Sequence, residues 1–114
     1  MGNATRHGAA IFVLALLITG CAKPEDKWLK EQISIMEQSA DHYDKVTDKS
    51  SLDQVQPTIT ALFDRYGKLN EEINALPPDR KEAVKKKYEP LLVPAITRST
   101  VARTKAMKAV GLDF

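Results

Sequence analysis

Few side chains in this sequence have the chemistry that catalysis or metal binding requires, and they are scattered. The chain of 114 residues contains one cysteine, Cys21, and two histidines, His7 and His42. His42 lies between Asp41 and a second acid at position 44, a combination that suits acid–base work or metal binding. A zinc site needs three or four ligands, however, and no histidine or cysteine follows His42. We therefore expect His42 to be a solvated helix residue, and the sequence predicts no metal, no cofactor and no enzymatic activity.

The cysteine closes a segment with three distinct parts. Residues 1–7 are polar and include the positive charge of Arg6, residues 9–18 form an unbroken apolar run, and Thr19 and Gly20 are small. A basic region, an apolar region and a small-residue cleavage site are typical, in this order, of a secretory signal peptide. As a helix, the apolar run would span about 15 Å, half of a hydrocarbon core of ~30 Å. It is therefore too short to cross a membrane.

The residues Ile18-Thr19-Gly20-Cys21 resemble the lipobox of bacterial lipoproteins. This resemblance covers residues 1–21 and implies cleavage after Gly20 and attachment of diacylglycerol to the Cys21 thiolate, which is the nucleophile. It also implies acylation of the new amino terminus, and two or three acyl chains hold a protein stably at a membrane. In that family, aspartate directly after the cysteine retains the protein at the inner membrane. Ala22 at this position favours the periplasmic side of the outer membrane in a host that has one.

The resemblance divides the chain into a signal peptide over residues 1–20, a lipidated tether over residues 21–26 and a helical domain over residues 27–114. The domain itself is similar only in outline to small helical lipoproteins of unknown function. Its fold must therefore be inferred from its own apolar pattern.

Apolar residues recur at helical spacing in three segments of the domain. The first runs from Pro24 to Lys49, where a proline followed by two acids suits a helix start. The second opens at Ser51, which begins a capping box. Pro57 either marks the true start of this helix or kinks its first turns. The apolar residues of the second segment follow steps of three and four, an a/d heptad pattern: Leu52, Val55, Ile59, Leu62, Tyr66, Leu69, Ile73 and Leu76.

The third segment begins after Pro77 and Pro78 and ends at Val110, with Gly111 as its carboxyl-terminal cap. Pro90 and Pro94 lie inside it and predict a bend. Three amphipathic segments with short links predict an all-α fold, an antiparallel three-helix bundle. The inward positions of the third segment are Val84, Tyr88, Leu91, Ala95, Ser99, Ala102, Ala106 and Ala109.

Charge is unevenly distributed along the domain. Residues 25–49 contain seven acids and four bases, whereas residues 79–108 contain nine bases and three acids. The formal net charge is only +2, so no strong global field indicates nucleic acid. Two interpretations stay open. Either the first and third helices are electrostatically matched neighbours, or a basic cluster contacts an anionic surface such as lipid headgroups or cell-wall polymer. That cluster consists of Arg80, Lys81, Lys85 and Lys86.

The sequence thus predicts a membrane-anchored, non-enzymatic envelope lipoprotein whose helical domain binds a protein, a cell-wall component or a membrane component. The alternative is a self-associating structural lipoprotein, a homo-oligomer whose second-segment heptad pairs between chains. At the carboxyl end we expect Leu112 and Phe114 to fold back on the bundle. Capture of the free carboxylate by a peptide-binding groove is the alternative there.

Overall fold

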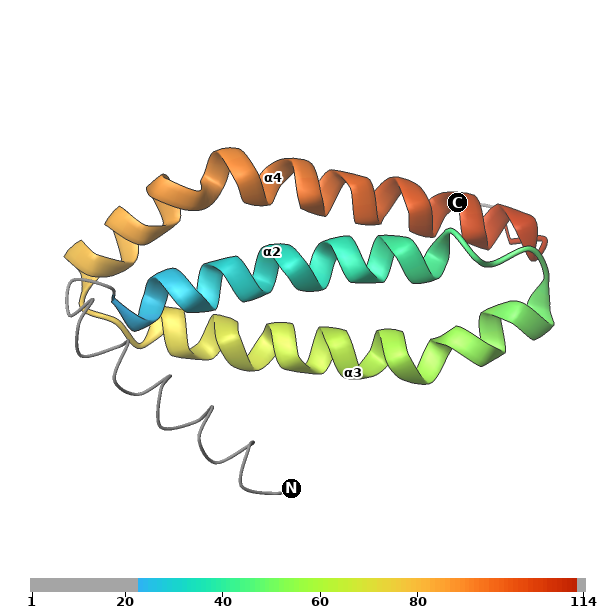
Figure 1. Cartoon of the computed structure of the whole chain (residues 1–114), viewed down its shortest axis with the longest axis horizontal. Helices are drawn as coiled ribbons and strands as arrows, with labels where there is room; N and C mark the ends of the chain where they lie inside the picture. Colours follow the sequence, from blue (N-terminus) through green and yellow to red (C-terminus); the bar gives the residue numbers. More distant parts are fainter. Residues whose placement is uncertain (1–22, 113–114) are drawn as a thin grey trace, which may run out of the picture.

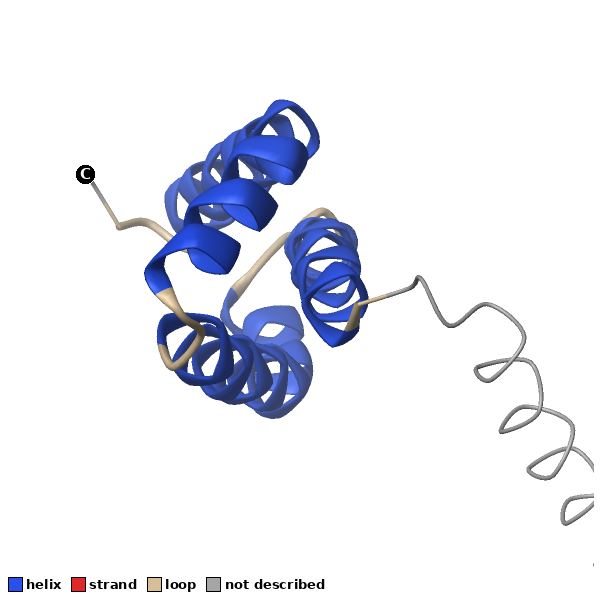
Figure 2. Cartoon of the chain, turned by 90° about the vertical axis from the view of Figure 1, so that its left-hand side faces the viewer, coloured by secondary structure: helices blue, strands red, loops and turns tan. Residues whose placement is uncertain are grey.

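The computed structural model describes residues 23–112. Three helices follow one another: α2 over Pro24–Tyr43, α3 over Lys49–Asn74 and α4 over Pro78–Ala109. Figure 1 shows them running alternately in opposite directions, with α2 between α3 and α4. Seen from the end in Figure 2, the three helices lie at the corners of a triangle. The described residues contain no strand, and the predicted all-α antiparallel three-helix bundle is confirmed.

Helix α2 begins at Pro24, where the helix start is predicted, but it ends earlier than predicted. It includes Glu25 and Asp26, which fall in the predicted tether. Proline at the first helical position needs no hydrogen-bond acceptor, and acids in the first turn are stabilised by the helix dipole. At the other end, α2 stops at Tyr43 and not at Lys49. Residues 44–48 form the link to α3.

Helix α3 begins with a capping box that starts earlier than predicted. Asp48 is the N-cap, and its Oδ1 accepts a hydrogen bond from the Ser51 amide at 2.9 Å. The Ser51 Oγ accepts in return from the Asp48 amide at 3.1 Å. Ser51 is therefore the third residue of the helix, because Asp48 supplies the stronger acceptor. Pro57 lies inside α3, and Figure 1 shows the first turns of this helix at an angle to the rest.

The predicted heptad of α3 faces the interior of the bundle. Leu52, Ile59, Leu69 and Ile73 are buried, and the other four heptad residues are half-buried. Two apolar clusters result. The cluster at the α2–α3 link contains Ala40, Tyr43, Val46, Leu52, Ile59, Ala102 and Ala106. The cluster at the opposite end contains Leu29, Ile73, Val84 and Tyr88.

Helix α4 is continuous but not straight. Pro90 and Pro94 lie inside it, and Figure 1 shows the helix arched, as the two prolines predict. The predicted inward face is wrong at Leu91, whose side chain is 59% exposed, whereas Leu92 packs against the core. It is also wrong at Ala109, which is exposed. Proline removes a helical hydrogen bond and its ring displaces the preceding turn. The helix is therefore distorted near residue 91, and Leu92 faces the core in place of Leu91.

The end of α4 is closed by a Schellman motif. Gly111 has a φ of +88°, its amide donates to the Lys108 carbonyl at 3.0 Å, and the Leu112 amide donates to the Met107 carbonyl at 2.9 Å. The predicted cap at Gly111 is confirmed. Leu112 remains 49% exposed, while Phe114 lies outside the described residues.

Candidate interaction surfaces

The predicted cleavage and lipidation residues precede the described part of the chain. Gly20 and Cys21 lie outside residues 23–112, as does the predicted signal peptide. The described chain starts at Lys23, and α2 then begins at the end of the bundle where α3 passes into α4 (Figure 1). Within residues 23–112, no helix is both long and apolar enough to traverse a bilayer.

The first turn of α2 is joined to the first turns of α4 by charged side chains. The Arg80 guanidinium donates two hydrogen bonds to the Glu25 carboxylate, with N···O distances of 2.9 and 2.6 Å. The Glu25 side chain is only 2% exposed, and the two hydrogen bonds from Arg80 lower the pKa of that carboxyl. About two turns further along α4, Lys87 pairs with Asp26 at 3.1 Å. We call the Glu25–Arg80 and Asp26–Lys87 pairs the charged clasp.

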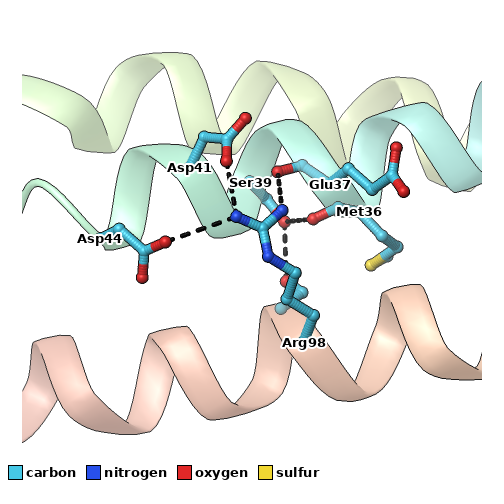
Figure 3. Close-up of polar contacts among 7 residues, drawn as sticks. Met36, Glu37, Ser39, Asp41, Asp44 and Arg98 are labelled. Carbon is cyan, nitrogen blue, oxygen red and sulfur yellow. Dashed lines mark hydrogen bonds and ion pairs between the residues drawn. The ribbon is translucent and has the colours of Figure 1, made fainter.

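A second group of charges joins the middle of α4 to α2. Figure 3 shows the Arg98 side chain reaching from α4 to Asp41, where the N···O distance is 2.7 Å, and towards Asp44 at 3.5 Å. Arg98 also donates to the backbone carbonyl of Glu37 at 3.3 Å. The two acids beside His42 thus bind an arginine of the same chain. Among the described residues, no three histidine, cysteine or acidic side chains gather where they could hold a metal ion.

Between these charges, small residues bring α2 and α4 close together. Ser39 and Ser99 are buried, and their hydroxyl oxygens lie 2.7 Å apart in a shared hydrogen bond. The Ser39 hydroxyl also donates to the Met36 carbonyl at 2.8 Å. Ala40 and Ala102 are buried on the same interface. The ion pairs of Arg80, Lys87 and Arg98 with acids of α2 confirm the prediction that the first and third helices are electrostatically matched neighbours.

The predicted basic cluster is divided by this arrangement. Arg80 is bound to Glu25 and belongs to the clasp. Lys85 and Lys86 are exposed and Lys81 is half-buried, and none of the three forms an ion pair within residues 23–112. The structure thus leaves three lysines of the predicted cluster available to an anionic surface, all on the first turns of α4.

Helices α3 and α4 touch each other far less than each touches α2. The short link over residues 75–77 joins the two helices at one end of the bundle, and the arch of α4 separates their middle parts (Figure 1). The space between them contains two hollows floored by α2, with volumes of about 470 and about 250 Å³. We call the two hollows together the α3–α4 groove.

The floor of the α3–α4 groove comes from α2 and its walls come from the other two helices. The floor includes Met36 and Tyr43 in the larger hollow and Leu29 and Gln32 in the smaller one. Burial raises the pKa of Tyr43 against the effect of nearby Arg103, so its hydroxyl remains neutral. The α3 wall includes Gln56, Ile59, Thr60, Phe63, Asp64, Tyr66, Asn70 and Ile73. The α4 wall includes Lys85, Glu89, Leu92, Val93, Ile96, Ser99, Thr100 and Arg103.

The groove combines exposed apolar residues on one wall with a polar residue on its floor. Val93 and Ile96 expose apolar side chains along its α4 wall, at 53% and 36%. On the floor, Gln32 is buried and donates a hydrogen bond to the Tyr66 carbonyl at 3.4 Å. Comparison of the chain with family models, with curated proteins and with solved structures gave no match. The candidate site therefore depends on this chain's own geometry.

The sequence prediction did not include this groove, although one signal for it was present. Beside the α3 heptad runs a second stripe at the same spacing, formed by Gln56, Thr60, Phe63, Gly67 and Asn70, and none of these residues is charged. These uncharged residues distinguish this face of α3 from the charged positions elsewhere on the helix.

Proposed function

We propose that this protein is a lipid-anchored lipoprotein of a bacterial cell envelope and that its helical bundle is a non-enzymatic binding module. The observation that carries this proposal is the sequence Ile18-Thr19-Gly20-Cys21 behind an apolar run of ten residues. A lipid on Cys21 would hold the protein at the exported face of a membrane, and Ala22 favours the outer membrane.

The position of α2 supports a bundle held close to the membrane. The helix begins at Pro24, three residues after Cys21, so the intervening segment is at most about 10 Å long. The charged clasp then ties this first turn to α4. Lys81, Lys85 and Lys86 lie on the same end of the bundle, where anionic headgroups would attract each of them by ~1 kcal/mol. The α3–α4 groove remains open along the side of the bundle for a protein or cell-wall partner.

The proposal is tested by replacing the lipidated residue. Cells producing the natural chain or the Cys21→Ser chain are labelled with a radioactive fatty acid and separated into membrane and soluble fractions. We expect label and membrane association only for the natural chain. The far-ultraviolet circular dichroism of the two chains should agree, because position 21 precedes the bundle. A Cys21→Ser chain that stays labelled and membrane-bound would contradict the proposal.

The contribution of the lysines is tested separately with the Cys21→Ser chain and anionic vesicles. Double replacement Lys85→Glu and Lys86→Glu should weaken vesicle binding, whereas Lys105→Glu near the other end of α4 should change it little. Doubling the salt concentration should weaken binding of the parent chain, because surface charges are screened over a Debye length. Binding that is insensitive to salt would show that the lysines do not act through headgroup charge.

The alternative, a self-associating structural lipoprotein, is favoured by the regular heptad of α3. Four of its eight residues are buried within a single chain, so pairing between chains through this seam would require the bundle to open. Sedimentation velocity of the detergent-solubilised chain distinguishes the two functions. A helical monomer supports the binding module, and an oligomer that loses helix on dilution supports self-association.

A further inference from the structure

The walls of the α3–α4 groove carry two stripes of residues with the spacing of a helix-packing seam. On α3, Gln56, Thr60, Phe63, Gly67 and Asn70 follow steps of four, three, four and three. All of them except Gly67 line the groove, and Gly67 lies on the same helical face one turn from its neighbours.

The α4 wall repeats this pattern on the other side of the groove. Lys85, Glu89, Leu92, Ile96, Ser99 and Arg103 follow steps of four, three, four, three and four, and all of them line the groove. Two antiparallel helices that carry such stripes on either side of a helical floor form the seat that a fourth helix occupies in a four-helix bundle. The shape of the groove therefore suits a helix better than a compact small molecule.

Gly67 adds a second observation that points to the same occupant. Glycine in a helix interior costs about 1 kcal/mol relative to alanine. A Cβ atom placed on Gly67 would meet no atom within 4 Å, so no contact inside the chain requires its absence. The missing side chain instead leaves space on the α3 wall, where a docked helix can approach the backbone closely.

The charges of the groove decide between a different protein and a second copy of this chain. Lys85 and Arg103 mark the two ends of the α4 wall, five helical turns or about 27 Å apart, and neither forms an ion pair within residues 23–112. If α4 of a second copy filled the groove in antiparallel register, Lys85 would face Arg103. In parallel register each cation would face itself. Like charges in contact oppose both arrangements.

We propose that the α3–α4 groove seats one amphipathic helix of a different envelope protein. This helix is about five turns long, has small and apolar residues towards α2, and carries an acidic residue near each end to meet Lys85 and Arg103. Between its ends it is uncharged or basic, because Glu89, one turn from Lys85, and Asp64 on the α3 wall also line the groove. The inference rests on the proposed function of the bundle as a binding module, and it names the site and the chemistry of the partner.

The test uses the full chain in nanodiscs of uncharged lipid and a fluorescent peptide of about 20 residues. The peptide has leucine and alanine at heptad spacing and glutamate near both ends, about five turns apart. A matched peptide has lysine at those two positions. We expect the glutamate peptide to bind about tenfold more tightly than the lysine peptide, measured by fluorescence anisotropy, because only the former complements both groove cations.

Two variants locate the binding site. Gly67→Arg fills the α3 wall and should weaken binding of the glutamate peptide at least about tenfold. Ala61→Arg makes the same change on an exposed position of α3 outside the groove, and binding should be unchanged. Circular dichroism and thermal unfolding show whether both variants are folded. In Arg103→Glu, the preference for glutamate over lysine should diminish or reverse.

Equal binding of the two peptides, or equal loss of binding in Gly67→Arg and Ala61→Arg, would overturn the proposal. Concentration-dependent dimerisation that Gly67→Arg abolishes would assign the groove to a second copy of this chain and would overturn it as well. The peptide result is independent of the fatty-acid labelling of Cys21, so failure of the groove and failure of the lipid anchor are distinguishable.

Discussion

Helix α4 faces α2 on one side and α3 on the other. It packs tightly against α2, whereas a groove separates it from α3. Towards α2 it presents small side chains, a buried hydroxyl pair and three cations that meet acids. Towards α3 it presents exposed apolar residues and two cations without ion-pair partners in residues 23–112, and a groove lies between the helices. Both sides have heptad-like spacing, so spacing alone does not determine whether an interface closes.

The difference follows from the size and charge of the side chains. Alanine and serine are small enough to allow two helix backbones to approach closely. Charged side chains that pair across the interface form strong hydrogen bonds, which offset the free-energy cost of removing them from water. On the other side, the bend of α4 at Pro90 and Pro94 carries it away from α3, and the stripe on α3 has only one large apolar residue, Phe63. The comparison predicts that the α2–α4 side is sensitive to added volume and that the α3–α4 side tolerates it.

The largest expected effect comes from overfilling the closed side. Ala40 is completely buried, and Ala40→Leu should lower the free energy of unfolding by about 3 kcal/mol, because the α2 and α4 backbones must separate. Thr60→Leu in the groove should change it by less than about 0.5 kcal/mol. Urea unfolding followed by circular dichroism measures both. Equal losses would remove the distinction between the two sides.

The charged clasp predicts how the closed side responds to acid. The pKa of Glu25 is lowered from its ordinary value of 4.5, so its ionised form stabilises the fold above that value. This contribution is lost as the pH falls through the lowered pKa. Urea unfolding on either side of pH 4.5 should therefore show a smaller dependence on pH for Glu25→Gln than for the natural chain.

A residual slope is expected in Glu25→Gln, because the pKa of Glu31 is also lowered, mainly by a hydrogen bond from Arg65. Identical pH profiles of the two chains would show that Glu25 gains nothing from its contact with Arg80.

A smaller effect is expected from the hydroxyl pair. Ser99→Ala removes one side of the 2.7 Å contact, but the Ser39 hydroxyl keeps the Met36 carbonyl as its acceptor. The free energy of unfolding should therefore fall by about 1 kcal/mol. Ser39→Ala leaves the Ser99 hydroxyl buried without this partner and should cost at least as much. If Ser99→Ala is as stable as the natural chain, the pair contributes no net stability.

The smallest expected effect has the opposite sign. Gly67→Ala should raise the free energy of unfolding by about 0.5–1 kcal/mol, because alanine is the better helix former and its Cβ meets no neighbour. Thermal unfolding measures the change. A loss of stability would mean that the α3 wall is in contact with another part of this chain. The α3–α4 side would then not be an open groove.

The sequence predicted the helical bundle well because the seams depend on local periodicity. Gly111 and the bend at Pro90 and Pro94 were also predictable, since glycine and proline act on their own backbone. The end of α2 was not. Residues 44–48 contain no glycine or proline, and Asp48 competes with Ser51 for the role of N-cap.

The interaction surfaces were less predictable, because they depend on distances between helices. Arg80 belongs to a basic run in the sequence, and only the fold shows that Glu25 neutralises it. The groove arises from the direction that α4 takes after its bend, which no single stretch of sequence specifies. Its one local signal is the uncharged stripe on α3, and that stripe gains meaning only when the helix beside it is known.

The charged clasp has a mechanical consequence. Any force on the chain at Lys23 enters the bundle at the first turn of α2, where Glu25 and Asp26 are bound to Arg80 and Lys87. The load is therefore shared at once between α2 and α4, and both ion pairs must break before the first turn of α2 can leave the bundle.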